Sequence, residues 1–483
     1  MKACSTMLLF LATIVWFSGL SHGNDRTGPQ DYTNSSKTAN LFSSPTIDTT
    51  TNLFQRKKTN KPVASPTSPS PAPGSDYVPN ASTLSKLIIC GYQGWFAFPG
   101  DGAPINKWKH WFSSDYDPSV SNLEVDMYPS MDEYDAADLL ESNILMKDGS
   151  KAKFFSSARP NVVKKHFQWM RDYGISGVFQ MRFMENMDLP KNREWKTMVL
   201  RNVKAAAEST GRVFAVSYNL AGNSINDSVL DAIKLDWMDL VDNERITESS
   251  RYIRHTGLPV LRIFGVGFKT VNVTDTKKLA ELIKWFKTDA EPQYHVFLIG
   301  GVPRRWRDLT DDSREEKDWK DIYQSFHGIH PWHVGSWGTT TGFQSFYNNV
   351  IVNDAKLCAK QGILYMPTMW PGFSWHNLNE GNAQVNQIPR LGGNFMWAQA
   401  YSYVQNKNIN TVWMAQFDEV DEGTAIFKVA KNKQELPAEG NWLTLDADGV
   451  ALPNDWYLKL CGEAQKMLLG KIALTNKIPI KNK

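Results

Sequence analysis

Four acidic side chains gather late in the chain, at Asp418, Glu419, Asp421 and Glu422. The stretch 416–424 that contains them follows directly on the mostly apolar run 411–415, which has the composition of a buried parallel strand. Carboxylates crowded at the end of such a strand repel one another and lose solvation, so their pKa values are expected to separate. Two carboxyl groups with different pKa values can serve as a general acid and a general base. The alternative interpretation is a solvated acidic loop.

Acid–base cleavage of a glycosidic bond needs two carboxyl groups, one that protonates the leaving oxygen and one that activates water or attacks carbon. Glu419 and Glu422 are the principal candidates for these roles, and Asp126 is a third carboxylate predicted to reach them from a facing loop. A turn-forming aspartate explains Asp126 equally well. Histidine and cysteine do not occur in spacings typical of metal sites, so no metal or other cofactor is expected.

Side chains of the kinds that bind sugars follow several other apolar runs. Tryptophan is abundant, at 18 of 483 residues, and its flat ring can stack on a sugar, although a large aromatic core uses tryptophan equally well. Arginine, histidine and amide groups can bond to sugar hydroxyls. The predicted substrate-binding residues are Trp95, His110, Trp111, Arg182, Asn219, His333, Trp337, Trp370, His376 and Asp421.

The elements that must position these side chains alternate between short apolar runs and longer stretches of helical periodicity. This alternation predicts βαβ units and a parallel sheet. Eight such runs favour a (β/α)8 barrel with extended βα loops, in which functional residues gather at the carboxyl ends of the strands. An open, doubly wound sheet is the alternative, and Met238–Val241 could be a ninth strand or a helix end. The eight runs are Leu87–Tyr92, Gly177–Met181, Val213–Tyr218, Pro259–Phe264, His295–Ile299, Trp332–Gly335, Ile363–Met366 and Val412–Phe417.

Three segments resemble motifs of one known family. Residues 417–424, Phe-Asp-Glu-Val-Asp-Glu-Gly-Thr, are similar to a Phe-Asn-Glu-Trp-His-Glu-Gly-Thr signature, and 363–373 is similar to a Pro-x-x-x-Pro-Gly-Tyr segment on a seventh strand. The opening 91–96, Gly-Tyr-Gln-Gly-Trp-Phe, is similar to a secreted xylosidase/arabinosidase-like subgroup. In the order of these motifs the chain resembles the glycoside hydrolase family 71/99-like group, relatives of the endo-α-mannosidases. The resemblance implies a barrel fold and glycosidase activity on an oligo- or polysaccharide.

One position departs from the family pattern. The endo-mannosidases have a catalytic glutamate at the end of the third strand, where this chain aligns Asn219. An amide cannot act as a general acid or base. The second hypothesis is therefore a non-catalytic carbohydrate-binding or extracellular-matrix protein on a retained glycosidase barrel.

The two ends of the chain have a different composition from the middle. Residues 1–23 read as a secretory signal peptide, with an apolar run that ends in a small-residue cleavage site. Residues 24–79 are rich in Ser, Thr and Pro, which predicts a disordered stalk. The hydrolase-like domain is expected to span 80–475, and 476–483 form a basic tail.

These features predict a secreted glycoprotein. Sequons occur at Asn34, Asn80, Asn226 and Asn272, and the three cysteines after the signal allow at most one disulfide. A signal anchor, which would leave a type II protein in the secretory pathway, is the alternative. No stable membrane insertion is expected after signal cleavage. The net charge of +3, with scattered Lys and Arg, argues against a nucleic-acid partner, and a monomer is expected.

Overall fold

The structure is a computed structural model that describes residues 76–221, 226–271 and 276–482. The predicted signal peptide, residues 24–75 of the predicted stalk and the sequons at Asn34 and Asn272 lie outside the described residues. Folded backbone begins before the predicted boundary at residue 80, because the carbonyl of Tyr77 accepts a hydrogen bond of 2.6 Å from Arg212. The carbonyl of Pro79 likewise accepts one of 2.9 Å from Arg251.

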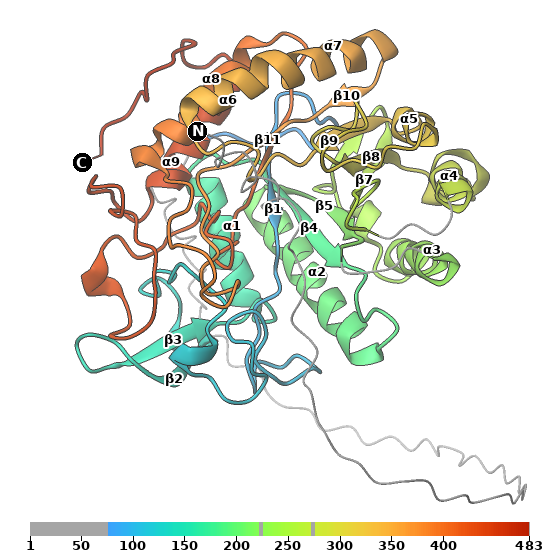
Figure 1. Cartoon of the computed structure of the whole chain (residues 1–483). Helices are drawn as coiled ribbons and strands as arrows, with labels where there is room; N and C mark the ends of the chain where they lie inside the picture. The colour runs from blue at the N-terminus through green and yellow to red at the C-terminus, as the bar shows by residue number, and fades with distance from the viewer. Residues whose placement is uncertain (1–75, 222–225, 272–275, 483) are drawn as a thin grey trace, which may run out of the picture. The chain divides into compact units, whose positions relative to one another are not determined.

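Parallel strands form a curled sheet at the centre of the fold (Figure 1). The neighbour order is β10-β9-β8-β7-β5-β4-β1-β12-β11. The strands are β1 (Ile88–Tyr92), β4 (Gly177–Phe183), β5 (Val213–Asn219), β7 (Leu258–Phe264), β8 (Phe297–Val302), β9 (Gly328–Pro331), β10 (Leu364–Tyr365), β11 (Thr368–Met369) and β12 (Val412–Met414).

The sheet closes into a barrel through an interrupted seventh strand. Its first half, β10, pairs with β9, and its second half, β11, pairs with β12. Pro367, between the halves, has no N–H to donate, but its carbonyl accepts from Trp413 at 3.0 Å. Strand β12 then pairs in parallel with β1, so the eighth strand position lies beside the first. The predicted (β/α)8 barrel is confirmed.

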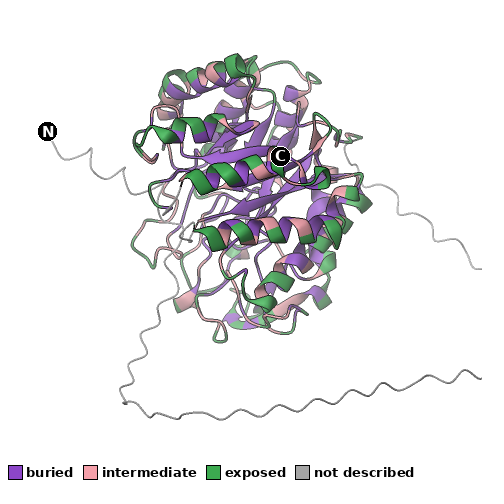
Figure 2. Ribbon diagram, turned by 90° about the vertical axis from the view of Figure 1, so that its right-hand side faces the viewer, coloured by how far each residue is buried: buried purple, intermediate pink, exposed green. Residues whose placement is uncertain are grey.

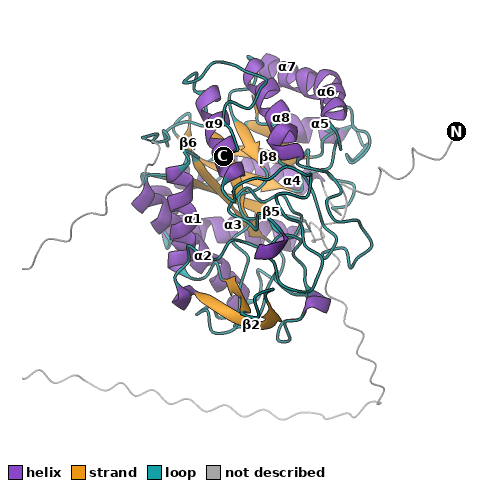
Figure 3. Ribbon diagram, turned by 90° about the vertical axis from the view of Figure 1, so that its left-hand side faces the viewer, coloured by secondary structure: helices purple, strands orange, loops and turns teal. Residues whose placement is uncertain are grey.

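Helices follow the strands and surround them (Figure 3). Local sequence explains several of their ends. Pro190 begins α2 at a position where its missing N–H costs nothing, and Gly211 ends that helix with a left-handed φ of 71°. Asn226 caps α3 by accepting from the N–H of Val229 at 3.1 Å. The α-helices are α1 (Pro160–Asp172), α2 (Pro190–Thr210), α3 (Asp227–Asp242), α4 (Thr276–Lys284), α5 (Asp318–Gln324), α6 (Thr340–Phe346), α7 (Val352–Gln361), α8 (Asn394–Gln405) and α9 (Trp456–Leu468).

Several smaller elements are attached to the barrel. An antiparallel hairpin, β2 (Leu139–Leu145) and β3 (Lys151–Phe155), is inserted between β1 and α1. The short β6 (Arg254–His255) pairs with β7. Turns of π-helix follow α4 at Trp285–Asp289 and α6 at Tyr347–Ile351. The 3₁₀ turns are Val120–Asn122, Ala136–Asp138, Ile246–Glu248, Pro292–Tyr294, Leu391–Gly393 and Lys433–Glu435.

The barrel strands are the core of the molecule. Every residue of β4 and of β5 is buried, as expected for parallel strands covered by helices on one side and by barrel contents on the other. In Figure 2 the buried strands run through the interior, while the helices around them expose one face. No helix in the described segments is both long and apolar enough to cross a lipid bilayer.

Two predicted elements differ from the structure. The sixth strand is Gly328–Pro331 and not Trp332–Gly335, which follows it as a loop. Met238–Val241 belongs to α3 and is no strand. Beyond α9 the chain remains attached to the barrel, since the indole N–H of Trp397 donates to the carbonyl of Thr475 at 3.1 Å.

Candidate active site

The acidic residues form a tight turn at the carboxyl end of β12. We call residues 418–424 the acid turn. Its shape depends on Gly423, whose φ of 59° is left-handed and whose added Cβ would lie 3.0 Å from the carbonyl oxygen of Ser374. The N–H of Ala425 closes the turn by donating to the carbonyl of Glu419 at 2.7 Å. Asp418, Glu419 and Asp421 are thus buried and Glu422 is half-buried, so the alternative of a solvated loop is wrong.

Asp418 joins the acid turn to the loop after β1. Its two carboxyl oxygens accept from the backbone N–H groups of Gln93 and Gly94, at 2.8 and 2.9 Å. Complete burial raises the pKa of Asp418 to about 7, although these two hydrogen bonds favour its ionised form. Asp418 therefore fixes the turn against β1.

Glu419 and Glu422 form a coupled pair of carboxyl groups. Burial raises the pKa of Glu419 well above its ordinary value, the charge of Glu422 raises it further, and a hydrogen bond donated by the side-chain amide of Gln93 opposes both effects. Burial also raises the pKa of Glu422 to about 7. The pair consequently holds a proton near neutral pH, with one carboxyl group protonated and the other able to ionise.

Asp421 contacts His110 on the opposite side of the turn. Oδ2 of Asp421 lies 3.1 Å from Nδ1 of His110, and the imidazole stacks on Trp95 with ring centroids 3.7 Å apart. Burial raises the pKa of Asp421 and lowers that of His110, and Lys109 and Lys196 lower the latter further. Both shifts favour the neutral forms, so Asp421 and His110 are expected to share a hydrogen bond with no net charge.

A pocket of about 170 Å³ opens beside this group. It lies between the loop after β1, the end of β4 and the start of α2, and Gln93, Trp95 and His110 form one wall. Glu419 and Asp421 are hydrogen-bonded to Gln93 and His110 respectively, so the pocket adjoins the acid turn. Five of the predicted site residues, Trp95, His110, Glu419, Asp421 and Glu422, are brought together here.

Other predicted residues gather elsewhere at the carboxyl ends of the strands. Asn219 ends β5, is buried, and accepts from the N–H of Ala221 at 2.9 Å. Trp337 packs on Trp370 with ring centroids 5.6 Å apart, and on His333 at 5.7 Å. All three of these aromatic residues are buried. Substrate contact by Asn219 and by this aromatic group stays a prediction.

Asp126 and His376 share one hydrogen-bonded loop. The carboxylate of Asp126 is fully buried and accepts from the hydroxyl of Ser374 and from the N–H groups of His376 and Asn377, both at 2.8 Å. The N–H of Ser374 in turn donates to the carbonyl of Glu422 at 2.9 Å. Asp126 therefore stabilises the loop that contacts the acid turn, which agrees with the structural, turn-forming role given as the alternative to catalysis. A catalytic role for Asp126 stays a prediction.

Arg182 and Trp111 are not brought to the pocket. Arg182 is buried behind the barrel wall, where it forms a two-pronged ion pair with Asp236 of α3 at 2.6 Å. The ring of Trp111 is buried among phenylalanines, and its N–H donates to the carbonyl of Phe155 at 2.9 Å. Both contacts are those of packing residues, because each side chain faces other elements and not the acid turn.

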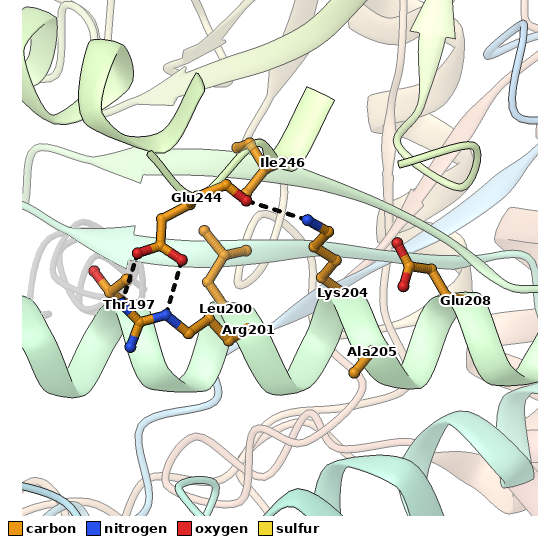
Figure 4. A pocket seen from close by; sticks show the side chains of 8 residues that line it. All are labelled: Thr197, Leu200, Arg201, Lys204, Ala205, Glu208, Glu244 and Ile246. Atoms are coloured by element: carbon orange, nitrogen blue, oxygen red, sulfur yellow. Dashed lines mark hydrogen bonds and ion pairs between the residues drawn. The ribbon is translucent and has the colours of Figure 1, made fainter. Parts of the chain in front are cut away.

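A second hollow, of about 270 Å³, lies on the outer face of α2 (Figure 4). Two of its charged groups pair, since Arg201 bonds both carboxylate oxygens of Glu244. Lys204 donates to the carbonyls of Glu244 and Arg245 at 3.1 and 3.2 Å. We therefore interpret this hollow as a groove between α2 and the segment that contains Glu244 and Ile246, and not as a binding site.

Within the described ranges, no group of three or more His, Cys, Asp or Glu is arranged to hold a metal ion. Cys90, Cys358 and Cys461 are buried free thiols.

The sequence alone did not identify three residues of the pocket region. Gln93 follows the first strand, a position that the barrel rule marks as functional, but its contact with Glu419 spans 326 residues. Lys196 and Trp195 lie on α2, where lysine and tryptophan resemble ordinary helix-surface and helix-core residues. No local signal distinguishes them.

Two solved structures share this architecture. The GH99 endo-alpha-mannosidase from Bacteroides thetaiotaomicron in complex with BIS-TRIS-propane is 15% identical, with a TM-score of 0.55 over 80% of this chain and 99% of that one. A second structure of the GH99 endo-alpha-mannosidase from Bacteroides thetaiotaomicron is 14% identical, with the same TM-score and coverage. No protein-family model and no curated protein matches the sequence. At this identity the likeness defines the fold, which is glycoside hydrolase-like.

Proposed function

We propose that the protein is a glycoside hydrolase of the 71/99-like group that cleaves an oligo- or polysaccharide. The observation that carries the proposal is the pair Glu419 and Glu422, which lies just after the last barrel strand at its carboxyl end and has raised pKa values. Active sites of such barrels lie at this end of the sheet. The glycoside hydrolase-like fold and the signature-like acid turn both support the proposal.

The chemistry requires one protonated and one ionised carboxyl group at the same pH. Because Glu419 and Glu422 repel each other as anions, the pair retains one proton while the other carboxyl group ionises. The protonated member donates to the leaving glycosidic oxygen, and the ionised member activates water or attacks the anomeric carbon. Gln93 holds Glu419 in place, and Asp126 braces the loop behind Glu422.

A glycan-library screen of the purified protein tests the proposal, scoring both bound and released sugar. Glu419→Gln and Glu422→Gln keep side-chain shape and remove the ionisable group. Each is expected to lower product release by about 10²–10⁴-fold while sugar affinity stays within severalfold. Full hydrolytic activity in the double variant would contradict the assignment and direct attention to Asp126 and Glu185.

The same screen separates the enzyme from a non-catalytic binder. Asn219 supports the binder, because the family resemblance aligns a catalytic glutamate at this position. A binder releases no product even as the wild-type protein. Its affinity would then fall more with Trp370→Ala than with either glutamine variant.

We further propose that the protein is a secreted, glycosylated monomer. The proposal rests on the signal-like residues 1–23 and on the four sequons, of which Asn80 and Asn226 are exposed. Expression in secreting cells should place the protein in the medium, with a mass that falls on treatment with an N-glycosidase. Retention in cell membranes would instead favour the type II anchor.

A further inference from the structure

The pocket beside the acid turn carries positive charge that hydrolysis by Glu419 and Glu422 does not use. Three lysines line it, Lys107, Lys109 and Lys196, with one acidic residue, Glu185. The charge of Lys109 also acts on the carboxyl group of Glu124, where burial raises the pKa and Lys109 opposes that rise. Lys107 is neutralised by Asp115 at 2.6 Å. In the described part of the chain, neither Lys109 nor Lys196 forms an ion pair with a carboxylate.

Lys196 is held in place by uncharged groups. Its Nζ donates to the carbonyls of Phe183 and Glu185 at 2.7 and 2.6 Å, which leaves one N–H of the ammonium group for a ligand. The pKa of Lys196 is lowered to about 7, because burial and the charges of Arg182 and Lys109 lower it by more than Glu185 and Asp236 raise it. An anion in the pocket would stabilise the charged form and restore a higher pKa.

Buried polar atoms of the pocket wall also lack partners. Oε1 of Gln93, Oε1 of Gln180, Nε1 of Trp95 and Nε1 of Trp195 make no hydrogen bond to any described residue. Two acceptors and two donors suit the hydroxyl groups of a sugar ring, which both donate and accept. The side-chain amide of Gln93 also reaches Glu419, so a sugar held here would lie next to the acid pair.

We propose that this pocket is a subsite for a sugar unit that carries an anionic substituent, either the carboxylate of a uronic acid or a sulfate ester. The inference rests on the proposed glycosidase function. A neutral sugar would offer Lys109 and Lys196 only hydroxyl oxygens as acceptors, whereas an anion would also balance their charge through stronger, charge-assisted hydrogen bonds. The subsite therefore selects acidic glycans.

Binding to matched sugars tests this inference. The probes are trisaccharides that contain glucuronate or galacturonate, each with its carboxyl-reduced form, and trisaccharides that contain galactose 6-sulfate, with their desulfated forms. Titrations of the wild-type chain and of Lys196→Met and Lys109→Met give the affinities. Lys204→Met is the matched control, because Lys204 lies on the same helix and also donates to two carbonyls, but in the other hollow (Figure 4).

We expect wild-type protein to bind at least one acidic trisaccharide about tenfold or more tightly than its neutral form, and this preference to weaken as salt rises. Lys196→Met and Lys109→Met should each remove most of the preference, whereas Lys204→Met should keep it. The carboxylate and sulfate pairs distinguish the two sources of negative charge. Equal affinity for acidic and neutral forms, no binding of either, or the same loss in Lys204→Met would overturn the inference.

Product release from the same probes separates this inference from the proposed function. Selective binding of an acidic sugar without any cleavage would leave the subsite in place and count against hydrolysis. Cleavage of neutral glycans at a rate that the lysine variants do not change would support hydrolysis and overturn the subsite.

Discussion

Gln93 has a role both in the proposed hydrolysis and in the proposed selectivity for acidic sugars. Its backbone N–H donates to Asp418, its side-chain amide donates to Glu419, and the residue lines the pocket. One side chain thus fixes the position of a catalytic candidate and forms part of the adjoining subsite. Its hydrogen bond also favours the ionised form of Glu419 and so restrains the rise of that pKa.

Gln93→Leu should shift the pH–rate profile upward. The variant removes the hydrogen bond that stabilises ionised Glu419, so the pKa of Glu419 rises further. If Glu419 is the general acid, the alkaline limb moves up; if it is the base, the acidic limb does. Rates measured from pH 4 to 9 identify which limb moves. Gln180→Leu is the control, since the amide N–H of Gln180 donates to a backbone carbonyl, and an unmoved profile in Gln93→Leu would contradict the prediction.

Glu422→Gln should gain stability relative to wild type as pH rises. The folded-state pKa of Glu422 is raised to about 7, above its ordinary value of 4.5, so the stability this group contributes is present at low pH and lost as pH rises through 7. Glutamine stays neutral throughout. The difference in free energy of unfolding, variant minus wild type, should grow by about 1–2 kcal/mol between pH 4 and 8, after discounting for partial exposure.

Urea unfolding at several pH values measures that difference. Glu315→Gln is the comparison, because Lys269 lowers the pKa of Glu315 and the ionised form of this residue favours folding. For this variant, the difference in free energy of unfolding, variant minus wild type, should fall as pH rises. A difference for Glu422→Gln that stays constant or shrinks as pH rises would show that the folded protein does not raise this pKa.

At the scale of elements, the apolar runs predicted the barrel because each strand buries both faces and so needs a continuous apolar sequence. The sixth strand was misplaced since Gly328–Pro331 is short and contains His330, which bonds to Arg262 inside the barrel. The acid turn was found because its carboxylates follow a strand directly. The contacts of Gln93 with Glu419 and of His110 with Asp421 could not be predicted, because long βα loops bring together residues that are more than 300 positions apart in the sequence.

Gly423→Ala should disrupt the acid turn. A left-handed alanine costs about 1–2 kcal/mol, and here the added Cβ would also press against the backbone of Ser374. Gly257→Ala carries the same left-handed strain, at φ 86°, with no atom within 4 Å of the added Cβ. Thermal unfolding should show a larger fall in Tm for Gly423→Ala, and hydrolysis should drop by about tenfold or more in that variant alone. Equal effects in the two variants would mean that the turn tolerates the extra methyl group.

At the scale of the molecule, barrel closure makes distant segments depend on one another. The residues before β1 run beneath the barrel and bond to its wall, so the folded unit begins upstream of the first strand. The hydroxyl of Tyr77 lies 3.0 Å from that of Ser176, and the carbonyls of Tyr77 and Pro79 accept from Arg212 and Arg251. These contacts hold the guanidinium group of Arg212, which is buried, and that of Arg251, which is half-buried.

Two truncations should therefore differ in stability. A chain that begins at Asp76 keeps both carbonyl acceptors and should unfold at the temperature of the full-length protein. A chain that begins at Ala81 leaves Arg212 and Arg251 each without one acceptor, which should cost about 1–3 kcal/mol and lower Tm by several degrees. Calorimetry of both chains measures the difference. Equal Tm values would show that these contacts add nothing to the barrel, whereas a loss in the longer chain would mean that residues 1–75 stabilise it, against their interpretation as signal and stalk.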